Sequence, residues 1–117
     1  MRIRALFVLA LLVAATAPAY ADRRSDAKAQ VEFGISIAQK GLWKGAIERF
    51  LRAVELDPAY AQAWNDLGIG YEQQGNFAEA RKAYEKALLL EPKNTLIKQN
   101  YELFREIYDR QNRRRDR

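Results

Sequence analysis

The residues best able to do chemistry are carboxylates, lysines, arginines and tyrosines, because the 117-residue chain contains no histidine and no cysteine. Their absence excludes Cys/His zinc and haem sites, thiol nucleophiles and every Ser-His or Cys-His catalytic pair, so Ser25 and Ser36 lack a base. The acidic residues instead stand near basic ones at helical spacing, as in Glu48 and Arg52, which is typical of exposed ion pairs. The residue types therefore predict a binding protein with no catalytic residues, no metal site and no cofactor.

The basic residues concentrate at the C-terminal end. The chain has 20 Lys+Arg and 15 Asp+Glu, a net charge of +5, and residues 109–117 hold five arginines against two aspartates, which gives +3. This basic tail could contact an anionic surface such as a membrane, an envelope polymer or nucleic acid. No aromatic residue is interleaved with the arginines, which disfavours base stacking and hence nucleic acid, and a solubilising chain end is the other interpretation. The arginines of the tail are Arg110, Arg113, Arg114, Arg115 and Arg117.

Residues 1–21 have the pattern of a secretory signal peptide. Two arginines precede an uninterrupted apolar stretch over 5–15, Pro18 interrupts it, and residues 19–21 form a small-x-small cleavage site. The apolar stretch is shorter than the roughly 20 residues that a membrane-spanning helix needs. We therefore expect cleavage after Ala21, export to a bacterial periplasm or the medium, and no transmembrane span in the mature chain. An uncleaved N-terminal anchor is the alternative.

The elements that would position these residues repeat with a period of 34. Aligning residues 27–60 with 61–94 produces ten identical pairs, whereas ordinary residue frequencies would produce about two. In both units apolar residues recur at helical spacing on either side of a glycine, and a proline follows the second run. Each unit therefore predicts a helix, a tight turn and a second helix. The identical pairs are Ala27/Ala61, Ala29/Ala63, Gly34/Gly68, Ile35/Ile69, Gln39/Gln73, Gly41/Gly75, Ala46/Ala80, Ala53/Ala87, Leu56/Leu90 and Pro58/Pro92.

The second unit resembles the tetratricopeptide repeat, whose spacing is W-x2-L-G-x2-Y…A-x3-F…A…P. The matching residues are Trp64, Leu67, Gly68, Tyr71, Ala80, Tyr84, Ala87 and Pro92. The first unit departs from that pattern, with Gln30 in place of the tryptophan and Ile37 in place of the tyrosine. The resemblance implies an all-α fold, an α-solenoid of two helix-turn-helix repeats plus a C-terminal capping helix.

The remaining segments follow from this division. Residues 22–26 form a short leader, the repeats occupy 27–60 and 61–94, the capping helix occupies 95–110, and 111–117 is a basic disordered tail. One broad apolar face is expected on the capping helix, made by Leu96, Ile97, Tyr101, Phe104 and Tyr108. Three repeats are usually needed for stability, so the capping helix completes the stack or an exposed face docks on a partner or a second copy.

The resemblance also implies a function, because stacked tetratricopeptide repeats hold peptides or helices of other proteins in a concave groove lined by their first helices. Some members grip a C-terminal carboxylate with Lys, Asn and Arg, but the matching positions here include Ile35, Asp66 and Leu96, so that clamp is missing. We predict an exported, non-enzymatic adaptor with a mildly apolar groove. The other interpretation is that the aliphatic positions are merely half-buried between helices. The predicted groove residues are Val31, Ile35, Gln39, Gln62, Asn65, Ile69 and Gln73.

Overall fold

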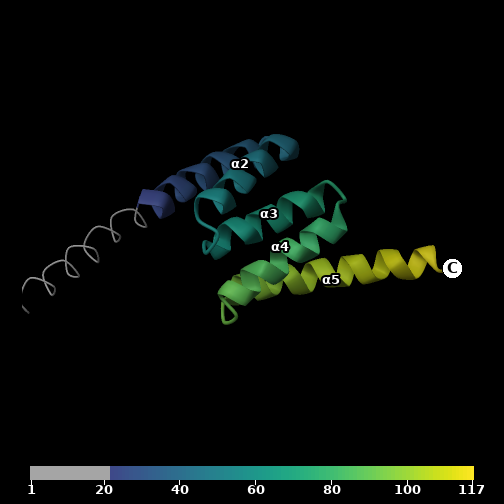
Figure 1. Cartoon of the computed structure of the whole chain (residues 1–117). Coiled ribbons are helices and arrows are strands. Elements are labelled where there is room, and N and C mark those ends of the chain that lie inside the picture. Colours follow the sequence, from purple (N-terminus) through teal and green to yellow (C-terminus); the bar gives the residue numbers. More distant parts are fainter. Residues whose placement is uncertain (1–21) are drawn as a thin grey trace, which may run out of the picture.

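The computed structural model describes residues 22–117, so the predicted signal peptide lies outside the described residues. Residues 22–38 are helical and are followed by four further helices, with no strand between 22 and 117. None of these helices is both long and apolar enough to cross a membrane. The predicted all-α fold is therefore confirmed. The four labelled helices in Figure 1 are α2 (Trp43–Leu56), α3 (Ala61–Gln73), α4 (Phe77–Leu90) and α5 (Thr95–Arg115).

The turn inside each unit depends on one glycine. Gly41 and Gly75 have φ angles of 77° and 75°, in the left-handed region that other residues rarely adopt. Their amides donate to carbonyls three residues back, from Gly41 to Ala38 over 2.8 Å and from Gly75 to Glu72 over 3.0 Å. The same turn chemistry 34 residues apart gives both helix pairs the same reversal of direction.

Each helix pair packs closely because a helical glycine lies under an aromatic ring. A Cβ atom on Gly34 would lie 2.5 Å from Cε1 of Phe50, and one on Gly68 would lie 2.9 Å from Cδ1 of Tyr84. Contacts this short do not occur between real side chains, so the rings occupy the space that a larger residue would need. The predicted close approach is confirmed. The small residues of the second helices are fully buried, and they are Ala46, Ala53, Ala80 and Ala87.

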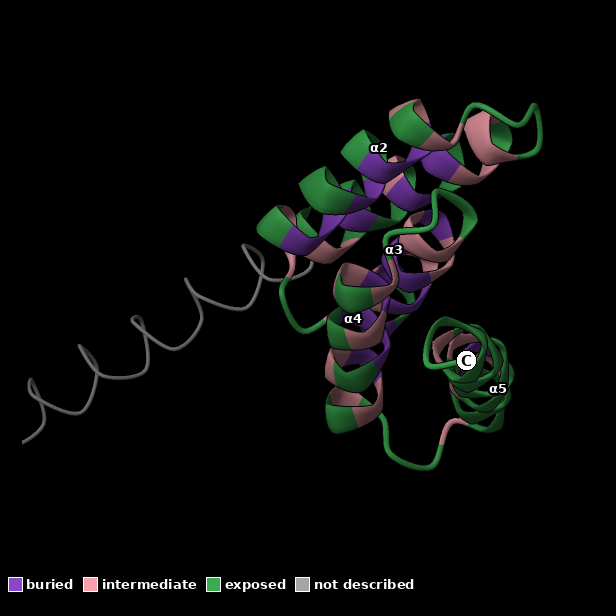
Figure 2. Ribbon diagram, turned by 90° about the vertical axis from the view of Figure 1, so that its right-hand side faces the viewer, coloured by how far each residue is buried: buried purple, intermediate pink, exposed green. Residues whose placement is uncertain are grey.

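Helix α5 caps the stack with an aromatic cluster. Phe104 is fully buried, and its ring centroid lies 5.4 Å from that of Tyr84 and 5.8 Å from that of Tyr108. Leu96, which the sequence placed on this apolar face, is instead 62% exposed, because the neighbouring Ile97 occupies the buried position. The buried residues line the faces that the helices turn toward one another, whereas α5 is largely exposed around its circumference (Figure 2).

Helix α5 also extends beyond its expected end at residue 110, to Arg115, through a segment for which disorder was expected. Arg110 forms an ion pair with Glu106 one turn earlier. Three arginines follow in the last turn of α5, where the helix dipole favours positive charge. The helix dipole thus favours the additional helical residues, and the ion pair lies in the turn before them.

Candidate functional site

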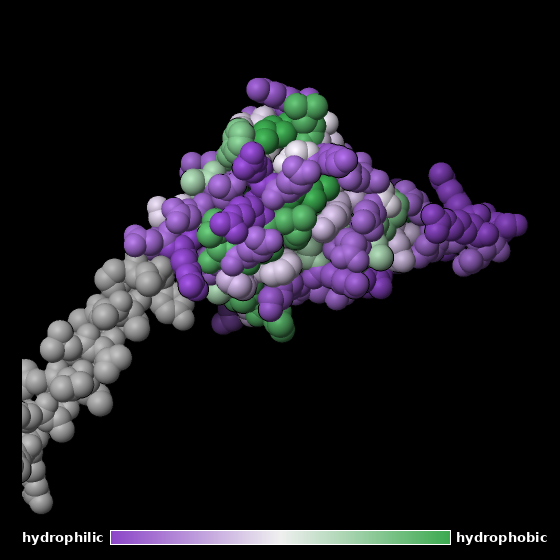
Figure 3. All heavy atoms as spheres, turned by 45° about the horizontal axis from the view of Figure 1, so that its top comes forward, coloured by the Kyte–Doolittle hydropathy of each residue, from purple (hydrophilic) through white to green (hydrophobic). Residues whose placement is uncertain are grey.

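A hollow of about 300 Å³ lies among the helix over 22–38, α2 and α3. We call it the apolar hollow, since most of its lining is aliphatic or aromatic. Ile35 and Ala38 are three residues apart, as are Asp66 and Ile69, so each pair faces the same side of its helix. On the molecular face in Figure 3, hydrophobic side chains form a broken band flanked by polar ones. The lining residues are Ile35, Ala38, Gln39, Trp43, Phe50, Asp66 and Ile69.

Three of the seven predicted groove residues, Ile35, Gln39 and Ile69, line this hollow. Two others are interior residues, which corrects the prediction that they face the groove. Val31 is 1% exposed and belongs to the apolar core. Asn65 is 3% exposed, and it is the only buried polar residue among those described.

The burial of Asn65 has a specific reason. The side-chain amide of Asn100 on α5 donates to Oδ1 of Asn65 over 3.1 Å. This hydrogen bond joins α3 to α5, and it satisfies a polar group that would otherwise be costly to bury. Asn65 therefore helps to hold two helices together.

A second hollow, of about 270 Å³, lies between α3 and the segment that enters α5. We call it the polar hollow, because its lining is rich in amides and carboxylates. The predicted groove residue Gln62 belongs to it, and the Tyr60 hydroxyl donates to its Oε1 over 3.1 Å. Gln73, at the C-terminal end of α3, is exposed and lines neither hollow. The lining residues are Tyr60, Gln62, Asn65, Asp66, Glu91, Asn94, Leu96 and Ile97.

Asp66 lines both hollows. The amide of Asn65 donates to its Oδ1 over 3.4 Å, which is a long hydrogen bond. Its Oδ2 is buried and has no hydrogen-bond partner among the described residues. Burial raises the pKa of the Asp66 carboxyl to about 6, although the amides of Asn65 and Gln62 act in the opposite direction. The Asp66 carboxylate can therefore accept a further hydrogen bond, and it lies beside an apolar surface.

The sequence-based prediction of the site missed Asp66, Trp43 and Phe50. A signal for Asp66 was available, because it precedes Ile69 by three residues and therefore shares its helix face. No comparable signal pointed to Trp43 or Phe50, since both match packing positions of the repeat. They reach the hollow because α2 contributes one of its walls.

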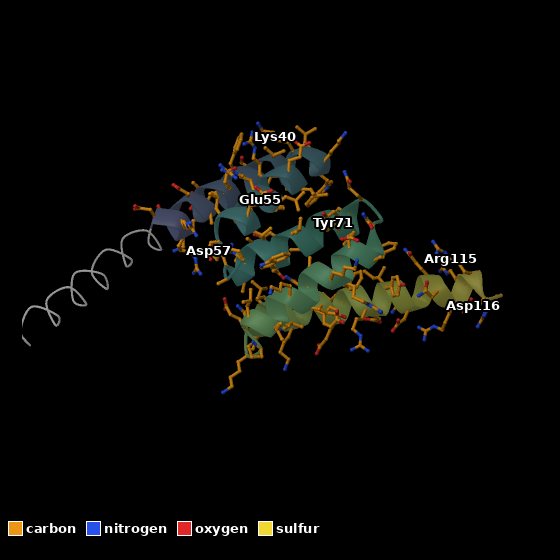
Figure 4. All side chains as sticks on the ribbon, in the orientation of Figure 1. Lys40, Glu55, Asp57, Tyr71, Arg115 and Asp116 are labelled. Carbon is orange, nitrogen blue, oxygen red and sulfur yellow. The ribbon has the colours of Figure 1, made fainter. Side chains whose placement is uncertain are left out.

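The arginines of the tail lie apart from both hollows. Arg113, Arg114 and Arg115 are exposed in the last turn of α5. Figure 4 labels Arg115 and Asp116 at the tip of α5, away from the helices that carry the hollows. Within residues 22–117, no three acidic side chains gather closely enough to hold a metal ion.

Comparison with known families identifies the repeat. One model, described as tetratricopeptide repeat, matches residues 61–94, and a second, described as TPR repeat, matches residues 37–75. The first match has the same bounds as the second predicted repeat.

Individual relatives match more than half of the chain. The chain is 40% identical over 67 residues to the mouse protein O-mannosyl-transferase TMTC1, covering 57% of this chain and 7% of that protein. It is 32% identical over 77 residues to the chloroplastic protein PYG7 of Arabidopsis thaliana, covering 66% of this chain and 26% of that protein. It is 33% identical over 67 residues to a protein of Methanocaldococcus jannaschii, covering 57% of this chain and 78% of that protein. The chain thus spans only a small part of the first two relatives.

Solved structures agree on the fold. The second TPR of Spaghetti (RPAP3), bound to the HSP90 peptide SRMEEVD, superposes with a TM-score of 0.73 at 21% identity, covering 81% of this chain and 87% of that one. The Arabidopsis OM64 TPR domain superposes with a TM-score of 0.70 at 20% identity, covering 75% and 73%. With the matched repeats, the glycine turns and the helix pairs, these likenesses show that the chain belongs to the tetratricopeptide-repeat family.

Proposed function

We propose that this protein is an exported, non-enzymatic adaptor that binds a peptide or helix of a partner protein across its two hollows. The observation that carries the proposal is the apolar hollow of about 300 Å³, which exposes Ile35 and Ile69 beside the amide of Gln39. An apolar anchor of a partner would fill the hollow, while the amide would hydrogen-bond its backbone.

The solved TPR structures support protein binding as the type of function. The second TPR of Spaghetti is bound to an HSP90 peptide, and the second TPR domain of human RPAP3 is in complex with an HSP70 peptide. Both peptides are acidic and end in Glu-Val-Asp, whereas Asp66 brings a carboxylate to the groove of this chain. We therefore extend to this chain the mode of binding and not the peptide.

The experiment is affinity capture from a cell-envelope extract with two proteins, the unmodified one and the double variant Ile35→Glu/Ile69→Glu. A discrete partner protein that binds the first and is lost with the second supports the adaptor function. The matched control is Leu89→Glu, because Leu89 is 76% exposed on α4 and lines neither hollow. Circular dichroism checks that each variant remains helical.

A chain that ends at Asp109 separates groove binding from binding by the tail. Groove binding survives this truncation and tolerates moderate salt, whereas binding through the arginines disappears and falls steeply with salt. If the captured material were anionic lipid or polymer and were lost only with the truncated chain, the adaptor proposal would be overturned in favour of the tail.

Export has its own test. N-terminal sequencing of the protein recovered from a bacterial periplasm is expected to begin at Asp22. A recovered protein that begins at Met1 in the cytoplasmic fraction would contradict this part of the proposal and leave groove binding unaffected.

A further inference from the structure

We propose that the groove selects a partner segment in which an apolar residue is adjacent to lysine or arginine, and that Asp66 receives the cation. This inference rests on the proposed function, because it assigns the chemistry of the partner in the same groove. Three observations carry it: the unpaired oxygen of Asp66, the charges of the lining, and the position of Asp66 between the hollows.

The first observation is the unused acceptor. Within residues 22–117, Oδ2 of Asp66 is buried without a hydrogen-bond partner. Oδ1 accepts the long 3.4 Å hydrogen bond from Asn65, and the Gln62 amide also favours the ionised carboxylate. No Lys or Arg of the described chain forms an ion pair with Asp66, although other carboxylates such as Asp57 have one. Figure 4 shows Asp57 at the end of α2, where Arg24 reaches it from the helix over 22–38. Asp66 lines both hollows, so a ligand bound in either of them meets this carboxylate.

The second observation is the sign of the charges. Among the described residues, Asp66 and Glu91 are the only charged ones that line the two hollows, and both are acidic. The remaining polar lining consists of amides and the Tyr60 hydroxyl, which are neutral. An anionic partner would place a second negative charge beside an already unpaired carboxylate, which is costly, whereas a cation would pair with it. Charge complementarity therefore favours a basic segment.

The third observation requires the apolar and basic groups of the ligand to lie close together. Asp66 forms part of the wall of the apolar hollow, and the same residue also lines the polar hollow. A ligand that fills the apolar hollow with Leu, Ile or Val thus carries its next residues past Asp66. Burial raises the pKa of Asp66, which indicates an unfavourable charge in the free protein that a bound cation would relieve. The recognition element is an apolar residue adjacent to Lys or Arg.

Peptide selection tests this inference. A random 12-residue library displayed on phage is panned on the purified protein, and the enriched peptides are synthesised and measured by fluorescence anisotropy. The expected peptides share an apolar residue beside Lys or Arg. They bind Asp66→Asn about 10- to 100-fold more weakly than the unmodified protein, since a charge-assisted hydrogen bond is lost. The matched control, Glu48→Gln, removes one negative charge from an exposed site on α2 and changes affinity less than about twofold.

A double-mutant cycle that changes both the peptide and Asp66 separates loss of their contact from any effect of Asp66→Asn on the folding of the protein. Replacing the Lys of a selected peptide by Gln is expected to cost at least about tenfold against the unmodified protein. The same replacement should cost less than about twofold against Asp66→Asn, because the partner of the Lys is already absent. Equal losses against both proteins would overturn the inference.

The outcomes also separate this inference from the proposed function. Peptides that lose binding to Ile35→Glu/Ile69→Glu but bind Asp66→Asn unchanged would overturn the role of Asp66 and leave the groove function standing. Acidic peptides selected on the same groove would overturn the assigned partner chemistry. A library that yields no peptide sensitive to Ile35→Glu/Ile69→Glu counts against both proposals.

Discussion

The two repeats share the glycines and alanines at which the helices of each pair approach closely, and they differ at other positions. Gly34 lies under Phe50 in the first repeat, and Gly68 lies under Tyr84 in the second. The turn glycines differ by only 2° in φ, at 77° and 75°. The repeated positions thus set the distance and direction of the helices, and leave the remaining positions free to diverge.

The differences lie at positions with a particular neighbour. Val31 is core in the first repeat, whereas its counterpart Asn65 bonds to Asn100 of α5. The Tyr84 hydroxyl donates to Oε2 of Glu72 over 2.7 Å, a bond that Phe50 cannot make. At these two positions the second repeat therefore has polar side chains where the first repeat has apolar ones. Asp66 is the neighbour of one of them, Asn65.

The largest expected effect comes from removing the Tyr84 ring. Tyr84→Ala leaves a cavity above Gly68 and removes the contact with Phe104, so the free energy of unfolding falls by about 3–5 kcal/mol. Tyr84→Phe makes the second repeat like the first and loses only the hydrogen bond to Glu72, about 1 kcal/mol. Urea denaturation followed by circular dichroism measures both values. Equal losses for the two variants would show that the hydroxyl, and not the ring, carries the stability.

The next effect concerns Asp66 and has a defined dependence on pH. Its pKa is about 6 in the folded chain and 3.8 in an unperturbed carboxyl. At a pH between these two pKa values, the Asp66 carboxyl is protonated in the folded state and ionised in the unfolded state. Asp66 therefore lowers the free energy of unfolding more and more as the pH rises from 3.8 to about 6. The phenols that face Asp66, Tyr60 and Tyr84, remain neutral there, because burial raises the pKa of both.

Asp66→Asn therefore stabilises the protein at pH 7 by at most about 3 kcal/mol and has little effect below about pH 4. Thermal or urea unfolding at pH 4 and pH 7 measures the difference, with Glu48→Gln as the control for loss of one charge. A variant that is less stable than the unmodified protein at pH 7 would contradict the assignment of Asp66 as an unpaired, buried carboxylate.

The smallest effect tests the polar connection to α5. Asn65→Val copies Val31 into the second repeat, and its hydrogen bond to Asn100 is lost. A double-mutant cycle with Asn100→Ala is expected to give a coupling energy of about 0.5–1.5 kcal/mol. Val31 and Asp66, the positions 34 residues earlier, share no side-chain hydrogen bond, and the cycle of Val31→Ala with Asp66→Asn serves as the control. A coupling near zero between Asn65 and Asn100 would mean that α5 is held only by its aromatic cluster.

Much of the fold could be predicted because its determinants are local. The turn glycines, the prolines after α2 and α4, and the Gly68–Tyr84 spacing each specify a helix boundary or contact within one repeat. The end of α5 was harder to predict, because residues 111–115 have no apolar periodicity, which is the pattern that predicted the other helices.

The site was predicted in part, for a different reason. Helical spacing correctly placed Ile35, Gln39 and Ile69 on one surface. It could not place Asn65, whose burial depends on Asn100, 35 residues away. It could not reveal the state of Asp66 either, since an unpaired oxygen is a property of the whole environment and not of the residue type. The sequence alone thus misjudges residues whose state depends on contacts with a distant part of the chain.

The neighbour-to-neighbour packing of the helices also governs how fast the chain folds. Even the hydrogen bond from Asn100 to Asn65, which joins the second repeat to α5, closes a loop of only 35 residues. Bringing such close segments together costs little chain entropy, so folding in microseconds to milliseconds is expected. Each helix pair can nucleate by itself, and the next helix adds to a template already formed. Fast folding buries the apolar surface early, and this shortens the period in which an unfolded chain could aggregate with another copy.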